Sequence, residues 1–195
     1  MRVNDRARDV SNFSERDDDV ASDPQQRGSG VRARAERVPS ATQLAVKESP
    51  QLSIAMPASE AMLEPTYAYL SAYCFALFGP AVALRLNVAV YELLANALRH
   101  GAPGSEARVE LTRLGQGVAL VVHNRAEPAQ LARLQQQIER VQSDPGAAFA
   151  NEMDRFVGAS QPPPMLGIVR VAHEAGLRLE LSIDQSEVRI STWCR

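Results

Sequence analysis

A single amphipathic stretch, residues 86–101, limits the folds open to this chain more than any other segment. Its apolar residues recur at helical spacing and form one continuous stripe: Leu86, Val90, Leu93, Leu94 and Ala97. Gly101 and Pro103 then supply the signals that end a helix. A helix with one apolar face must bury that face against another element, and we expect it to pack on a β-sheet.

Alternating apolar residues predict strands on both sides of this helix. Residues 52–56 alternate before it, and residues 107–114 and 118–124 alternate around a short glycine-bearing turn, which indicates an antiparallel hairpin. Residues 177–183 and 187–194 form a second pair of the same kind. Helical periodicity predicts further helices over residues 59–78, 128–141, 147–157 and 165–174. The expected fold class is α+β, a sandwich of one sheet and one helical layer.

The beginning of the chain has a different composition. Residues 1–50 hold 9 of the 21 Lys and Arg residues and 9 of the 23 Asp and Glu residues, with Phe13 as their only aromatic residue. Such a segment cannot bury enough apolar surface to offset the entropy lost on ordering. We therefore predict a disordered charged tail over residues 1–48 and one folded domain over residues 49–195.

Charge and hydropathy argue against several classes of protein. A net charge of −2 and a pI near 6.0 give no electrostatic footprint for nucleic acid. No apolar run reaches the roughly 18 uninterrupted residues expected of a membrane-spanning helix, and no signal-peptide core follows Met1. We therefore expect a cytoplasmic protein in which Cys74 and Cys194 are reduced thiols.

Glu92 and Asn96 stand one turn apart on the amphipathic helix, at the border of its apolar stripe. A carboxylate and an amide so placed are able to hold a hydrated magnesium ion and to orient a nucleophile beside a phosphate. The same spacing also occurs in ordinary polar pairs on helix flanks. Spacing alone leaves both interpretations open.

The amino-acid sequence of residues 86–101 also resembles a motif of a known protein family. Glu92, Asn96 and Ala97, followed by His100 and Gly101, resemble the N-box of the GHKL superfamily of ATP-binding domains, and are most similar to its anti-sigma-factor kinase branch. The order of the expected elements matches that family over about residues 50–195. The resemblance implies a two-layer α/β sandwich whose mixed, mostly antiparallel sheet is covered by helices on one face.

The same resemblance implies ATP and Mg²⁺ as cofactors. It implies that Glu92 is the catalytic residue, which acts as the general base or lies near it. It also implies that Asn96 binds both the metal and the cofactor. It also places His100 at the cofactor, although a histidine at the negative end of a helix more often stabilises that end.

Two later segments resemble the glycine boxes of the family in part. Asn124 stands where the family has an adenine-binding aspartate and can still accept a hydrogen bond, while Ala126 replaces the first glycine. Gly167 retains the second glycine of the phosphate-binding box, at a helix start whose backbone N–H groups suit an anion. Asn124 is also a common turn residue, and Gly167 would also let a helix pack closely on the sheet.

Two polar helices in place of a glycine-rich lid, together with Asn124, resemble the SiaB-type switch kinases. The resemblance implies an ATP-dependent serine/threonine kinase of the anti-sigma, partner-switching type that acts on a STAS-domain protein in bacterial signalling. The alternative is a non-catalytic GHKL-like binding module that has kept the fold and the partner surface without the nucleotide. The sequence does not determine the oligomeric state, and a homodimer is one of the states left open.

Overall fold

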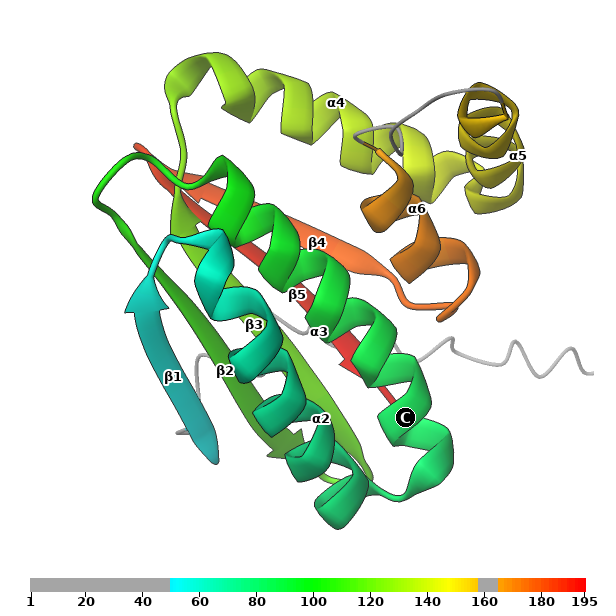
Figure 1. The fold of residues 1–195 in the computed structure, drawn as a ribbon. Coiled ribbons are helices and arrows are strands. Elements are labelled where there is room, and N and C mark those ends of the chain that lie inside the picture. Colours follow the sequence, from blue (N-terminus) through cyan, green and yellow to red (C-terminus); the bar gives the residue numbers. More distant parts are fainter. Residues whose placement is uncertain (1–49, 158–164) are drawn as a thin grey trace, which may run out of the picture. The chain divides into compact units, whose positions relative to one another are not determined.

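The computed structural model of the chain describes residues 50–157 and 165–195 (Figure 1). The charged tail predicted for residues 1–48 lies outside the described residues. The described residues form five strands, β1 (Leu52–Pro57), β2 (Glu106–Leu114), β3 (Gly117–Arg125), β4 (Leu179–Asp184) and β5 (Glu187–Cys194). They also form a short 3₁₀ helix, η1 (Glu60–Met62), and the helices α2 (Leu63–Phe78), α3 (Pro80–His100), α4 (Pro128–Ser143), α5 (Pro145–Phe156) and α6 (Leu166–His173).

The five strands make one sheet in the order β1-β2-β3-β5-β4. Central strand β3 pairs with β2 on one side and β5 on the other, so that Val122 lies between Val109 and Ile190. Both predicted hairpins are present. Every strand pairing in the described chain is antiparallel. The resemblance implied a mixed, mostly antiparallel sheet, and the described residues form a wholly antiparallel one.

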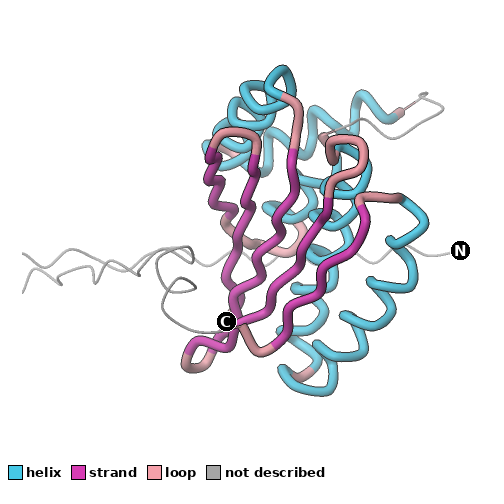
Figure 2. The backbone as a smooth tube through the Cα atoms, turned by 90° about the vertical axis from the view of Figure 1, so that its left-hand side faces the viewer, coloured by secondary structure: helices cyan, strands magenta, loops and turns pink. Residues whose placement is uncertain are grey.

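The helices gather on one face of this sheet (Figure 2). The predicted α+β class and two-layer sandwich are therefore confirmed. Alternation along the strands explains the layering: one set of side chains, including Val109, Leu120 and Val122, joins the core beneath the helices. The other set faces the opposite side of the sheet.

Helix α3 is the centre of the helical layer. It begins at Pro80, directly after Gly79, whose φ of 77° ends α2 and turns the chain. Ten of its residues are buried, among them Leu86, Leu93 and Leu94. Of the described helices, α3 has a length and hydropathy that would suffice for a membrane span, but this burial is typical of the core helix of a folded domain.

Helices α4 and α5 form the insert between the two hairpins. The predicted break between them is confirmed at Asp144, whose side chain accepts a 2.9 Å hydrogen bond from the backbone N–H of Ala147 and so caps α5. Helix α4 buries Ile138 and Val141 and leaves most of its length exposed. The insert thus brings polar side chains to one end of α3.

Candidate functional site

A pocket of about 240 Å³ lies between α3, the strands β3 and β5, and helices α4 and α6. Its walls are largely apolar and include Leu93, Val122, Ile168 and Ile190. These residues continue the hydrophobic core up to the pocket, so the cavity is a gap between the core and α4. Such a gap suits a flat, weakly polar group of a ligand.

Three predicted site residues meet in this pocket. Asn96 and His100 line it from successive turns of α3, and Asn124 lines it from the end of β3. The Nδ2 atom of Asn96 is buried and has no hydrogen-bond partner among the described residues. An unpaired buried donor costs about 1–3 kcal/mol. A ligand that supplies an acceptor to Asn96 would remove this cost.

His100 and Arg133 are the two basic side chains that line the pocket, near the end of α3. Partial burial lowers the pKa of His100, and the neighbouring cations Arg99 and Arg133 lower it further. Arg133 also lines the pocket, from α4. Its guanidinium is suited to a phosphate or another anion in this pocket. Burial and these cations therefore favour the neutral form of the His100 imidazole, which lies in the same pocket as the permanent positive charge of Arg133.

Glu92 lies on an adjoining face of α3, where it lines a second cavity together with Arg170 of α6. Its Oε1 atom accepts a hydrogen bond from Nη1 of Arg170 in an ion pair, and the Glu92 side chain is only 13% exposed. The Nε atom of Arg170 donates to Glu174 at 2.9 Å. One guanidinium therefore serves two carboxylates.

Gly167 is the residue of α6 that lets this carboxylate approach. A Cβ atom at position 167 would lie 2.6 Å from Oε2 of Glu92, closer than side chains tolerate without a shift. The five predicted site residues thus fall into two groups. Asn96, His100 and Asn124 share the pocket, whereas Glu92 and Gly167 contact one another beside it.

Burial raises the pKa of Glu92, and the nearby charge of Arg170 opposes part of that rise. A carboxyl group whose pKa is raised by folding stabilises the fold fully below its unfolded pKa, and that contribution is lost as the pH rises through the folded pKa. We therefore expect Glu92→Gln to gain stability relative to the wild type as the pH rises above about 4. Urea unfolding at a series of pH values measures the difference. The control is Glu139→Gln, an exposed site on α4, and a pH profile equal to that of the control would contradict the prediction.

Sequence reasoning missed Arg170 and the polar face of α4. Arg170 follows Gly167 by three residues on one helix, so helical spacing alone was a signal that both face α3. On α4, Gln130, Arg133 and Gln137 all line the pocket, at the spacing of one helical face. That spacing was visible in the sequence, but which side of α4 faces the pocket depends on tertiary packing.

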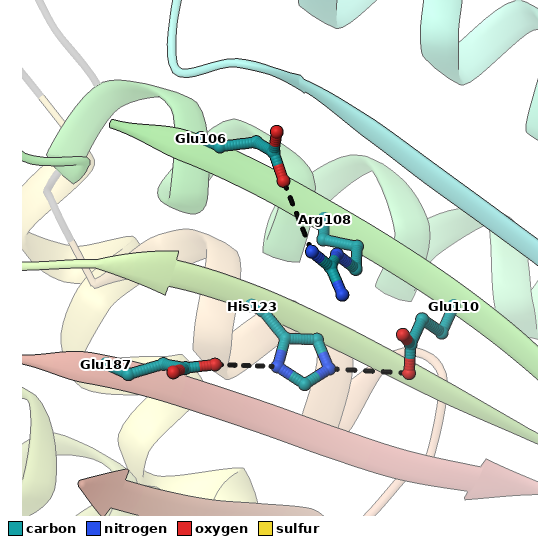
Figure 3. A network of polar contacts seen from close by, with 5 residues as sticks. All are labelled: Glu106, Arg108, Glu110, His123 and Glu187. Carbon is teal, nitrogen blue, oxygen red and sulfur yellow. Dashed lines mark hydrogen bonds and ion pairs between the residues drawn. The ribbon is translucent and has the colours of Figure 1, made fainter. Parts of the chain in front are cut away.

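A separate polar network occupies the face of the sheet opposite the helices (Figure 3). His123 of β3 lies 3.5 Å from a carboxylate oxygen of Glu110 and 3.5 Å from one of Glu187. Nearby, Arg108 pairs with Glu106 at 3.4 Å. The two His123 contacts link the neighbouring strands β2, β3 and β5, whereas the Arg108–Glu106 pair lies within β2. We therefore assign the network a structural role.

The side chains of the pocket are compatible in chemistry with the base and the phosphates of a nucleotide and with a magnesium ion. Apolar walls with two amides suit a base, and Arg133 suits phosphate. Residues 50–157 and 165–195 contain no group of three or more His, Cys, Asp or Glu side chains suited to a metal. Magnesium typically keeps several waters and binds through few protein oxygens and the phosphates, a role open to Asn96. The volume lies below the roughly 300 Å³ at which pockets for drug-sized ligands begin, so it has room for a ring system rather than for a whole nucleotide.

Comparison with known proteins supports the fold. No family model matches the chain, and no curated protein matches it in sequence. One chain in the crystal structure of the SiaB-SiaC complex from Pseudomonas aeruginosa is similar in structure, with a TM-score of 0.56 and 18% sequence identity over 78% of this chain and 94% of that chain. At this identity the likeness concerns the fold alone. At the level of the fold, this likeness agrees with the expected resemblance to SiaB-type proteins. Membership of the GHKL superfamily stays a prediction.

Proposed function

We propose that this chain is an ATP-dependent serine/threonine protein kinase of the partner-switching type, which phosphorylates a small STAS-type protein. The observation that carries the proposal is the pocket in which Asn96, His100 and Asn124 meet and in which the Asn96 amide is unpaired. The N-box resemblance of α3 and the likeness in fold to a chain crystallised in a two-protein complex support it.

In this proposal the pocket residues bind and orient the nucleotide. Asn124 offers a side-chain oxygen, the acceptor that an exocyclic amino group of a base requires. Asn96 supplies an amide oxygen for the metal, and Arg133 places positive charge beside the phosphates. When bound, ATP supplies the phosphoryl group and magnesium neutralises part of its charge.

Glu92 is the proposed general base for the hydroxyl group of the partner. Its raised pKa brings the carboxylate closer to the range in which a base works best near neutral pH. Arg170 holds Oε1 of Glu92, and Gly167 leaves room for Oε2. Arg170 is thus a positioning residue that fixes the carboxylate rather than a catalytic one.

A non-catalytic binding module is the second candidate. The ion pair between Glu92 and Arg170 favours it, because a carboxylate that is held against α6 is less available as a base. Ala126 also favours it, since a side chain at this position limits how closely a nucleotide approaches the backbone. Under this candidate the chain binds its protein partner without phosphate chemistry.

Nucleotide binding separates the two candidates. ATP with magnesium should raise the melting temperature of the full chain, because a ligand that binds only the folded state stabilises it by about 2.7 kcal/mol at a hundred times its Kd. Asn96→Ala should reduce that rise. Asn151→Ala, at an exposed asparagine of α5, is the matched control and should leave it unchanged. No rise at millimolar ATP and magnesium would contradict the kinase and favour the module.

A further inference from the structure

A groove of about 400 Å³ runs between α2 and α3, apart from the pocket of Asn96. We name it the α2–α3 groove and define it by Ser71 and Phe75 from α2, Leu84, Asn87 and Glu92 from α3, and Arg170 from α6. It adjoins the candidate site, because Glu92 and Arg170 close one end. Phe75 and Leu84 line its other end, close to the turn between the two helices.

A half-satisfied amide lies within this groove. Asn87 is 7% exposed, and its Nδ2 atom donates a 2.9 Å hydrogen bond to the hydroxyl of Ser71. The Oδ1 atom of the same amide is buried and has no partner among the residues that the structure describes. Buried polar groups in native proteins are nearly all paired, so an amide with one free end that lines a groove indicates a missing ligand group.

Apolar surface and charge flank this amide. Phe75 is 43% exposed and Leu84 is 61% exposed, although both are large apolar residues and both line the groove. At the other end, the carboxylates of Glu92 and Glu174 share the single guanidinium of Arg170. That end therefore carries an excess of one negative charge.

We infer that the α2–α3 groove binds a segment of a protein partner. The segment places an apolar side chain on Phe75 and Leu84, a backbone amide on Asn87, and a lysine or arginine beside Glu92 and Glu174. A peptide backbone both donates and accepts hydrogen bonds, so it suits an amide that has one free end. The inference goes beyond the proposed function, because it holds whether or not the neighbouring pocket binds nucleotide.

Charge and shape favour this occupant over two others. In an antiparallel twofold contact between grooves, the negative end of one copy would face the apolar Phe75 and Leu84 of the other, so its charge would stay unpaired. A small molecule would need an enclosed cavity, whereas Phe75 and Leu84 are open to solvent. A chain segment with complementary charge meets all three features.

The test selects binders from a displayed library of random short peptides against the full chain without nucleotide. An enriched peptide is then synthesised, and its Kd is measured by calorimetry. Phe75→Ser and Asn87→Leu should each weaken binding by about tenfold or more. Tyr69→Ser is the matched control, since Tyr69 is a 53% exposed aromatic residue of α2 outside the groove, and should leave the Kd unchanged. In ¹H–¹⁵N spectra of the wild type, the side-chain amide signal of Asn87 should move on titration.

Several outcomes would overturn the inference. They are the absence of any enriched binder, equal affinities for Phe75→Ser and Tyr69→Ser, and an Asn87 amide signal that does not move. A wild-type dimer that Phe75→Ser turns into a monomer in sedimentation would assign the groove to a second copy instead. If Asn87→Leu fails to fold, the Kd of Phe75→Ser alone decides the test, because the Phe75 side chain is already exposed in the wild type.

Discussion

Replacing Glu92 by glutamine should slow phosphoryl transfer to the protein partner by about 10²-fold or more, the usual scale for the loss of a positioned base. Glutamine has nearly the same shape but cannot take up the proton of the acceptor hydroxyl. Nucleotide binding should persist, because Asn96 and Asn124 line the pocket while Glu92 lies on an adjoining face of α3. The measurement is transfer of labelled phosphate from ATP to a STAS-type partner, at equal concentrations of folded protein.

Glu139→Gln is the matched control for this experiment. Glu139 is an exposed glutamate of α4 that lines neither the pocket nor the groove that Glu92 lines. Its replacement should change the transfer rate little. Wild-type activity that survives Glu92→Gln undiminished would return Glu92 to a structural role as the partner of Arg170. So would a loss of folding in Glu92→Gln.

The individual helices and strands could be predicted from the sequence, because each depends on residues that lie close together in the chain. The stripe of α3 and the glycines of the hairpin turns lie within a few residues of the structure that they determine. The strand expected over residues 187–194 is β5, Glu187–Cys194, without correction. The order of the strands in the sheet could not be predicted in the same way. β3 and β5 are separated in the chain by α4, α5, α6 and β4, and periodicity does not specify which neighbour a strand pairs with.

Sequence reasoning named five candidate site residues but could not show that the fold divides them into two groups. Four residues of a helix turn through about 400°, so Glu92 and Asn96 differ in direction by about 40°. That angle directs Asn96 into the pocket and Glu92 toward α6. The ion pair with Arg170 joins residues 78 positions apart, and it depends on how α6 packs on α3 rather than on any local pattern.

Shortening Leu93 to alanine should reduce the free energy of unfolding by about 2–5 kcal/mol, the range measured for buried leucines. Leu93 is 1% exposed, belongs to the core between α3 and the sheet, and also lines the pocket. The variant loses the transfer free energy of the removed carbons and leaves a cavity that rigid neighbours fill only in part. Since small domains are stable by only about 5–15 kcal/mol, this one change should be visible as a much lower urea midpoint.

Leu84→Ala makes the same chemical change on the same helix at a side chain that is 61% exposed. It should cost no more than about 0.5 kcal/mol, because little apolar surface returns to water. The difference between the two variants therefore isolates burial from helix propensity, which is common to both. A Leu93→Ala midpoint close to that of Leu84→Ala would mean that the pocket end of α3 packs loosely on the sheet. The rigid placement of Asn96 and His100 that the nucleotide proposal needs would then be lost, because both residues stand on the turns that follow Leu93.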